Sequence, residues 1–493
     1  MAKSLLRSPK RHALQRIIQK NTSLEPALQW NAHLSPSRRY LTSELYPRLS
    51  RQQVTYYLRY HEYNSEELND GAVKYFMTNK LAANHPIEDR AAEIRLKIHP
   101  DAPTSQYLFG MFDGHAGCAC AQVVSERLFS YIAVMLSPVE KLEKIKLGEI
   151  DPCNDLTYRF THKDNYYSSD MVELYRKSLQ RLASELLNAP NDDCTVDDIL
   201  KAAFMRLDHD ILADAIPDIG HSSVNLETIS LALSGTCATL AYIDESDLYV
   251  ANTGDCKAII GQQLEEDSWA AIPLSKEHIA ENSDEVERLN NQHPNERNQI
   301  LRNGRLLGDL APLRAFGDAR YKWPARVMKH VLNISNPNVI SIYGENLIPS
   351  NYKSPPYLTA EPEVMHHALS PRDKFLILAT DGLAEHLDEQ QIVDLVAGHM
   401  DERQILTEFV LPRHDITLGE VNEILKVRKR KLAKKPEDEN VATHLLRMAL
   451  GPAHGQISQY LTLPESIVRG YRDDITITVV YFDTDYLAKK ATK

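Results

Sequence analysis

The sequence predicts an α+β fold in which antiparallel strands are combined with separate helices. Short apolar runs of strand length recur along the chain, and several longer stretches carry apolar residues at helical spacing. Residues 235–261 hold three such runs separated by turns of only a few residues, and strands this close in sequence pair in antiparallel fashion. The chain has 493 residues, of which 43% are hydrophobic, so it is long enough to bury a large core.

Composition excludes several classes of protein. No stretch approaches the roughly 18 consecutive apolar residues of a membrane-spanning helix. The formal net charge is -12, which argues against a nucleic-acid partner and suits a protein that gathers cations. Six cysteines in a chain of this length do not form a disulfide framework, and a reducing compartment follows.

The first 40 residues differ in character from the rest. Residues 1–50 contain nine Lys or Arg and only two Asp or Glu, whereas the remainder is acidic. An Arg-rich, acid-poor, amphipathic start is typical of a mitochondrial transit peptide, and Arg38 and Arg39 precede a plausible processing point. We therefore predict a transit peptide at 1–40 and a location in the mitochondrial matrix, with a disordered basic tail as the alternative.

The globular body is expected to span residues 65–485. Strands are predicted at 73–78, 91–98 and 107–112, followed by a helix at 118–136 whose apolar residues share one face. Residues 137–170 are polar and irregular, which indicates a surface insertion.

Later segments continue the alternation of helices and strands. Residues 235–261 read as a three-stranded meander with turns at 244–246 and 254–255. Further insertions are expected at 319–358 and at 400–436. The basic run 426–435 within the last one is either a solvated helix face or a docking surface for an acidic partner. The remaining elements are helices at 171–188, 196–213, 283–292, 389–398 and 440–449, and strands at 375–379 and 475–482.

Carboxylates stand at the ends of several predicted strands. They are Glu88, Asp89, Asp113, Asp255, Asp381 and Asp473. If these groups converge, they repel one another unless cations neutralise them. Oxygen ligands favour Mg²⁺ or Mn²⁺ over zinc, and two such ions can activate a water for attack at phosphorus. His115 would then suit the general acid that protonates the leaving oxygen.

The same residues fall into motifs that resemble the metal-dependent, type 2C protein phosphatases. The resemblance covers residues 71–482, and its motifs occur in the family's order. They are Ile87-Glu88-Asp89, Phe112-Asp113-Gly114-His115, Ser234-Gly235-Thr236, Gly254-Asp255, Arg314-Ala315-Phe316-Gly317-Asp318, Thr380-Asp381-Gly382 and Arg472-Asp473-Asp474. Each motif alone is weak, whereas the ordered series is specific.

The resemblance implies a fold and a set of roles. The fold is a four-layer α-β-β-α sandwich of two mainly antiparallel sheets flanked by helices. Two Mg²⁺ or Mn²⁺ ions would be held by Asp89, Asp113, the Gly114 carbonyl, Asp381 and Asp473. His115 would act in catalysis with Asp89 and Asp113, Glu88 would support the metal shell, and Asp255 and Glu385 would hold a third, weaker ion.

Asn84 departs from the family pattern. The family usually has an Arg there that contacts the substrate phosphate, and an Asn can donate hydrogen bonds but brings no charge. The pyruvate dehydrogenase phosphatases of mitochondria share this Asn, and the chain is similar to them also around Gly117-Cys118-Ala119-Cys120 and Tyr471-Arg472. Asn84 is therefore expected to make a weaker phosphate contact.

This narrower resemblance implies a substrate and partners. The substrate would be phosphoserine on the dehydrogenase component of the pyruvate dehydrogenase complex. The partners would be the lipoyl domain of the dihydrolipoyl transacetylase, bound with the help of Ca²⁺, and a regulatory subunit. Three alternatives stay open: another mitochondrial phosphoprotein as substrate, a catalytically silent relative that only binds partners, and an acidic calcium-binding module. The last predicts an Asp-rich EF-hand loop, which the sequence lacks.

Overall fold

The computed structural model describes most of the chain from residue 48 onward. The described residues are 48–98, 104–161, 168–188, 194–217, 225–265, 268–297, 299–334, 347–349, 351–404, 413, 416–432 and 437–492. The predicted transit peptide at 1–40 lies outside them. Among the described helices, none is both long and apolar enough to cross a membrane.

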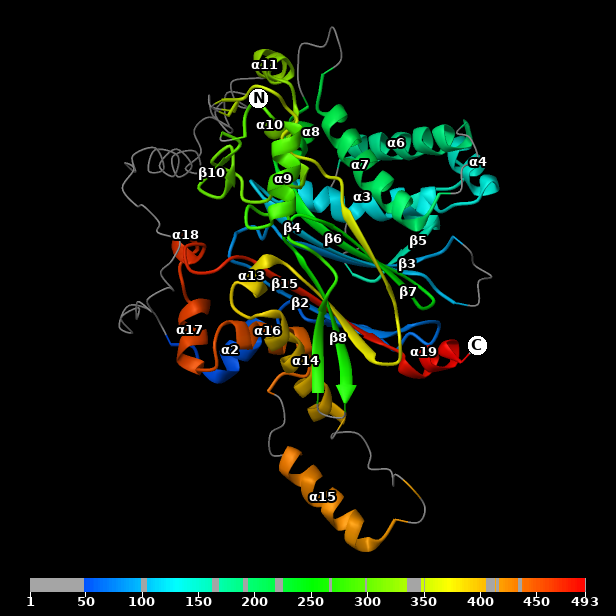
Figure 1. The fold of residues 1–493 in the computed structure, drawn as a ribbon, viewed down its shortest axis with the longest axis vertical. Coiled ribbons are helices and arrows are strands. Elements are labelled where there is room, and N and C mark those ends of the chain that lie inside the picture. Colours follow the sequence, from blue (N-terminus) through cyan, green and yellow to red (C-terminus); the bar gives the residue numbers. More distant parts are fainter. Residues whose placement is uncertain are drawn as a thin grey trace. The chain divides into compact units, whose positions relative to one another are not determined.

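Two antiparallel sheets form the centre of the body (Figure 1). The first sheet has the order β1 (Tyr63–Asn64), β2 (Val73–Leu81), β15 (Ile475–Phe482), β14 (Asp373–Ala379), β8 (Lys257–Glu265) and β9 (Ser268–Pro273). The second has the order β13 (Glu363–Ala368), β7 (Asp247–Thr253), β6 (Gly235–Asp244), β4 (Tyr107–His115), β3 (Arg90–Leu96) and β5 (Thr157–Arg159), with β12 (Phe316–Gly317) beside β6. A separate hairpin joins β10 (Leu301–Arg302) to β11 (Arg305–Leu306).

Helices cover the outer faces of both sheets. Around the second sheet lie α3 (Ala119–Met135), α4 (Val139–Leu147), α5 (Pro152–Asp155), α6 (Ser169–Asn188), α7 (Val196–Asp214) and α8 (Leu226–Leu233). Around the first lie α2 (Arg51–Leu58), α14 (Glu389–Gln404), α16 (Val441–Ala449) and α17 (His454–Leu461). The other helices are α9 (Ser283–Gln292), α10 (Ala319–Lys322), α11 (Ala325–Ile334), α13 (Asp381–Ala384), α15 (Leu418–Leu432), α18 (Glu465–Val468) and α19 (Thr484–Ala491).

The hydrophobic core is divided into layers, because successive side chains of a strand point to opposite faces of its sheet. Phe76, Phe109 and Leu376 point into the layer between the sheets, whereas Leu108 and Ile377 face the two outer helical layers. Three buried clusters therefore separate four layers of secondary structure. The predicted α-β-β-α sandwich is confirmed.

The predicted meander at 235–261 is wrong in its third strand. β6 and β7 do form the expected antiparallel hairpin. β8, however, pairs with β14 and β9 in the other sheet. Gly254 adopts a positive φ of 104° where the chain leaves β7. Its N–H donates to Nδ1 of the buried His278 at 3.0 Å, which fixes the turn as the chain crosses between the sheets.

Two stretches are more regular than the sequence indicated. The predicted insertion at 137–170 contains the helices α4 and α5 and the strand β5, which pairs with β3. β5 has only three residues, which is too short to give a strand pattern in the sequence. The predicted insertion at 319–358 contains α10 and α11.

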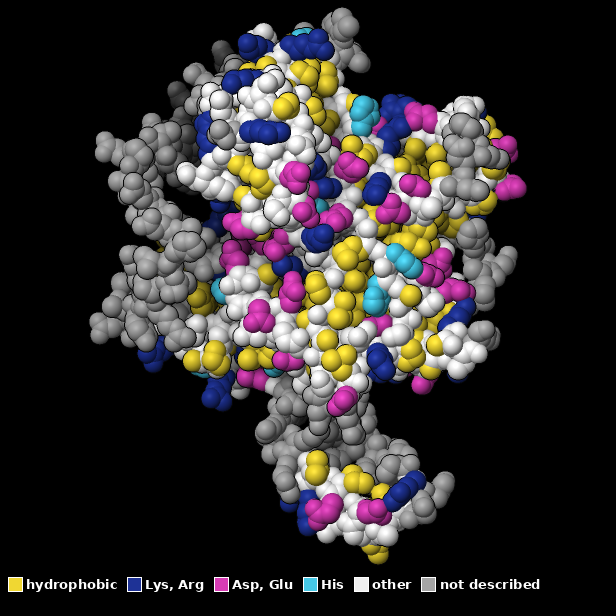
Figure 2. Space-filling view, viewed as in Figure 1, with side chains coloured by type: hydrophobic (Ala, Val, Ile, Leu, Met, Phe, Trp, Pro, Cys, Tyr) yellow, Lys and Arg dark blue, Asp and Glu magenta, His cyan; other side chains and the backbone are white. Residues whose placement is uncertain are grey.

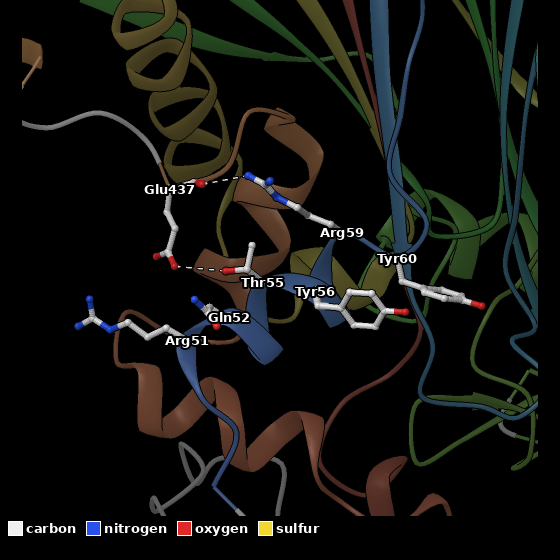
Figure 3. Close-up of a pocket in the computed structure, with 7 residues that line it drawn as sticks. All are labelled: Arg51, Gln52, Thr55, Tyr56, Arg59, Tyr60 and Glu437. Atoms are coloured by element: carbon white, nitrogen blue, oxygen red, sulfur yellow. Dashed lines mark hydrogen bonds between the residues drawn. The ribbon is translucent and has the colours of Figure 1, made fainter.

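The body begins before residue 65. Val54 and Leu58 of α2 are buried in the core cluster beneath the first sheet. On the other side of α2, Thr55 and Arg59 donate hydrogen bonds to Glu437, as the close-up in Figure 3 shows. The helix is therefore part of the compact unit that starts at Arg48.

The described part of the basic run lies on α15. Leu418, Leu425 and Val427 of this helix are exposed to solvent, as are Lys426 and Lys429. Figure 2 shows acidic and basic side chains side by side on the same helix. This exposure fits both sequence interpretations, a solvated helix face and a docking surface.

Candidate metal centre and active site

The two sheets bring the same end of six strands to one edge of the sandwich. β4, β14 and β2 finish there, and β3, β15 and β8 start there, because their pairings are antiparallel. The predicted site residues lie at or close beyond these strand ends, except Glu385, which follows the short helix α13 after β14. The spacing of the carboxylates in the sequence thus becomes a cluster in space.

Three carboxylates form the centre of the cluster. Oxygens of Asp113, Asp255 and Asp381 all lie within 4.8 Å of one another. Burial raises the pKa of Asp113 well above its ordinary value, and the charges of Asp89, Asp381 and Asp255 raise it further. Burial also raises the pKa of Asp381 to about 7, with Asp255 as the largest charge contribution.

Asp89 lies buried beside this centre and is fixed by two hydroxyl groups. Oγ1 of Thr380 and Oγ1 of Thr476 donate to the same Oδ2 of Asp89, at 2.9 and 2.8 Å. Burial and the charge of Asp474 nevertheless hold the pKa of Asp89 well above its ordinary value. Two hydroxyl groups therefore anchor Oδ2 of Asp89.

Asp474, which the sequence did not single out as a site residue, ties together the loop before β3. Its carboxylate accepts hydrogen bonds from the backbone N–H groups of Ala83, Asn84 and Glu88. The amide of Asn84 also donates to it, at 3.0 Å, and lies 3.5 Å from Oδ1 of Asp473. Only its place in the Arg472-Asp473-Asp474 motif could have indicated this role.

Glu88 and Gly114 bring two loops into direct contact. Oε1 of Glu88 accepts a hydrogen bond from the N–H of Gly117 at 2.6 Å. A Cβ on Gly114 would stand only 2.4 Å from the carbonyl oxygen of Glu88, so a side chain at 114 would push the loops apart. The glycine therefore lets the strand end approach the loop that carries Glu88 and Asp89.

Asp255 and Glu385 lie near different neighbours. Asp255 belongs to the central group with Asp113 and Asp381. Glu385 follows α13, where burial and the charge of Asp473 raise its pKa. The structure thus places Glu385 beside the Asp473 loop and Asp255 beside the strand ends of both sheets.

His115 is paired with Asp318, a second residue whose site role the sequence analysis missed. Nε2 of His115 lies 2.6 Å from Oδ2 of Asp318, which is almost fully buried. A Cβ on Gly235 would collide with both groups. Burial lowers the pKa of His115, but the charge of Asp318, with those of Asp255 and Glu88, outweighs it and raises the pKa above its ordinary value. The Arg314–Asp318 motif was the available signal.

The cluster has the chemistry of a divalent-cation site. All its ligand atoms are oxygens, and several of the carboxylates share one small region with raised pKa values. Such a set is stabilised in its charged form by hard cations such as Mg²⁺ or Mn²⁺. A protonatable imidazole stands beside it. Fold and site together define a metal-dependent hydrolase.

Comparison with known proteins identifies the family. Residues 141–413 match the family model described as protein phosphatase 2C. The chain is 40% identical over 94% of its length to "[Pyruvate dehydrogenase [acetyl-transferring]]-phosphatase 1, mitochondrial" of Bos taurus, covering 88% of that protein. The chain therefore belongs to the protein phosphatase 2C family, and it is a protein phosphatase.

Two further matches are more distant. The phosphatase 2 counterpart of Homo sapiens is 36% identical over 89% of this chain and 84% of that protein. A crystal structure of a serine-threonine phosphatase 2C from Toxoplasma gondii aligns with a TM-score of 0.45 and 15% identity, covering 86% of this chain and 99% of that one. The mitochondrial relatives confirm the predicted mitochondrial location, and the family confirms the dependence on metal.

Proposed function

We propose that the chain removes the phosphate from phosphoserine on the dehydrogenase component of the pyruvate dehydrogenase complex and so reactivates it, in the mitochondrial matrix. The observation that carries the chemistry is the group of Asp113, Asp255 and Asp381 where both sheets end. Support for the substrate comes from the similarity to the pyruvate dehydrogenase phosphatases, which extends over nearly the whole chain.

Five residues would hold two Mg²⁺ or Mn²⁺ ions. They are Asp89, Asp113, Gly114 through its carbonyl oxygen, Asp381 and Asp473. When bound, such ions lower the pKa of a water and neutralise charge on the phosphoryl oxygens. Asp255 and Glu385 would contribute to a third, weaker site.

The chain's own residues would position and protonate the reacting groups. His115 donates a proton to the serine oxygen as the phosphorus–oxygen bond breaks, so that the serine leaves as a neutral hydroxyl group. Asp318 contacts Nε2 of the imidazole, so Nδ1 would be the nitrogen that donates this proton. Glu88 holds the Gly117 N–H and thereby the loop that follows His115.

Recognition of the complex would use separate surfaces. The proposed partners are the lipoyl domain of the dihydrolipoyl transacetylase, with Ca²⁺ assisting the contact, and a regulatory subunit. Support for these partners is the resemblance alone. Because the exposed α15 carries several basic side chains, it is a reasonable first segment to delete when these contacts are mapped.

The test is a phosphatase assay on two substrates. Protein starting near residue 41 is given the phosphorylated pyruvate dehydrogenase complex or an unrelated phosphoserine peptide, each with Mg²⁺ and with EDTA. We expect metal-dependent activity on both, and much higher activity on the complex. Equal activity on both would keep the chemistry and contradict the assignment of the pyruvate dehydrogenase complex as the substrate. Activity that survives EDTA would contradict the metal mechanism.

A further inference from the structure

No Lys or Arg is among the predicted site residues that would surround the substrate phosphate. A phosphoserine carries a charge between -1.5 and -2 at neutral pH, and the site around it is built from carboxylates. The positive charge of bound Mg²⁺ or Mn²⁺ ions would be partly neutralised by those carboxylates. Phosphate sites in proteins commonly add an Arg, whose planar guanidinium donates two parallel hydrogen bonds to phosphate oxygens.

Asn84 brings no charge, and in this structure its donors contact carboxylates. Its side-chain amide donates to Asp474 at 3.0 Å and lies 3.5 Å from Asp473, and its backbone N–H donates to Asp474 at 2.8 Å. Releasing the amide would remove one of the donors that hold the Asp473-Asp474 pair. The contact expected at this position is thus engaged in holding carboxylates instead.

Arg469 reaches the site from another part of the chain. Its Nη1 lies 3.5 Å from Oε2 of Glu88, and its side chain is 57% exposed. That oxygen of Glu88 is buried and accepts no hydrogen bond from the described residues. The other oxygen of Glu88 accepts a hydrogen bond from the N–H of Gly117, so Arg469 is linked through Glu88 to the loop that follows the proposed proton donor His115.

The backbone of Arg469 is fixed while its side chain remains free to turn. Arg469 follows α18, whose Val468 is buried. Turn hydrogen bonds join Gly470 N–H to the carbonyl of Ile467 at 3.0 Å and Tyr471 N–H to that of Val468 at 2.9 Å. A long side chain on such an anchored turn can exchange a loose carboxylate contact for a stronger bidentate one.

Other cations near the site are directed elsewhere. Arg90 donates to the carbonyl oxygens of Ile87 and Asp89. Arg472 is buried and donates to the carbonyl oxygen of Ala82. Lys80 is the main rival, but it lines a cavity of about 350 Å³ together with Arg90 and Arg159 rather than approaching Glu88.

We propose that Arg469 is the phosphate-binding cation of this site and takes over the charge that Asn84 does not provide. In the resting protein its guanidinium lies against Glu88, and on substrate binding it turns to the phosphoryl oxygens. The proposal rests on the phosphatase function given above and deepens it. It names a residue that selects phosphorylated over unphosphorylated serine.

The test compares Arg469→Gln with Arg469→Lys and a matched control. The control is Arg176→Gln, because Arg176 is also exposed and also lies beside a single Glu, on α6. We expect Arg469→Gln to raise KM for a phosphoserine peptide, and the inhibition constant of inorganic phosphate, by about tenfold or more. Its kcat should change by less than about threefold, because the proton donor is untouched. The KM and inhibition constant of Arg469→Lys should lie between those of the wild type and Arg469→Gln. Those of Arg176→Gln should match the wild type.

Mn²⁺ titrations separate this role from a structural one. We expect Arg469→Gln to bind Mn²⁺ as the wild type does. A fall in Mn²⁺ affinity equal to the rise in KM would show that Arg469 acts through the metal shell, which overturns the proposal. Unchanged KM and phosphate inhibition in an active Arg469→Gln enzyme would also overturn it, as would a larger effect from Lys80→Gln. An inactive wild-type protein would instead contradict the proposed function.

Discussion

An Asp stands at each end of strand β14, and the pKa values of the two carboxyl groups are shifted in opposite directions. Asp373 starts the strand and Asp381 follows its last residue by two positions. Asp373 is fully buried and accepts hydrogen bonds from His367, Gln262 and Ser370. Burial alone would raise its pKa, but these donors hold the pKa of Asp373 below its ordinary value.

Asp381 is surrounded by other carboxylates, whereas Asp373 is surrounded by hydrogen-bond donors. Its neighbours include Asp255, Asp473 and Glu385, and burial among them raises its pKa to about 7. A carboxylate that the chain satisfies is part of the structure, whereas one that the chain leaves surrounded by like charge requires an external cation. Location at a strand end does not distinguish the two, but the surrounding donors do.

The largest expected contrast comes from replacing each Asp by Asn. Asp381→Asn should lower kcat at least about a hundredfold, because a metal ligand is lost. Asp373→Asn should keep activity within about threefold but lower the free energy of unfolding by about 2–4 kcal/mol, because buried charge-assisted hydrogen bonds are lost. Kinetics and urea unfolding of both variants check this. The comparison fails if Asp373→Asn is inactive while folded, or if Asp381→Asn keeps its activity.

Asp318→Asn tests the His115–Asp318 pair, by comparing two substrates whose leaving groups differ in their need for a proton. An alkoxide leaving from phosphoserine needs a proton, whereas p-nitrophenolate leaves without one. We expect kcat for a phosphoserine peptide to fall about 10- to 100-fold and kcat for p-nitrophenyl phosphate to change by less than about threefold. Equal losses on both substrates would mean that Asp318 supports the fold or the metals instead of His115.

The raised pKa values predict how the metal-free protein responds to pH. The folded-state pKa of Asp381 is about 7 against an ordinary 3.8, so its contribution to stability is complete below about pH 4 and is lost as pH rises to 7. The melting temperature in EDTA should therefore fall between pH 5 and pH 8, and saturating Mg²⁺ should remove much of that fall. In EDTA at pH 8, Asp381→Asn should melt about 2–6 °C above the wild type. A wild type that melts higher at pH 8 than at pH 5 would contradict the electrostatic account.

The smallest effect on stability and activity is expected at the end of β14 where the Asp373 carboxylate is hydrogen-bonded. His367→Ala removes one donor, at 3.2 Å, from a carboxylate that keeps three others. We expect a loss of about 1 kcal/mol in the free energy of unfolding and unchanged kcat, KM and Mn²⁺ affinity. Differential scanning calorimetry and steady-state assays measure these quantities. A change in Mn²⁺ affinity would show that the two ends of the strand are coupled.

The sequence by itself determined the elements and the chemistry they carry. Apolar runs such as Tyr107–Phe112 and Phe375–Ala379 predicted strands, and the carboxylates that follow them predicted an oxygen-ligand metal site. These signals are local, because strand propensity and turn residues act over a few positions. The β6–β7 hairpin was predictable for the same reason.

Only the tertiary structure decided which of these groups meet. β8 crosses to the other sheet, and that crossing carries Asp255 to the edge where Asp113 and Asp381 end their strands. His115 and Asp318 are 203 residues apart, and Arg469 approaches Glu88 across an even longer separation in sequence. Such contacts depend on the packing of distant strands and loops, and no local pattern encodes which side chain will stand opposite another.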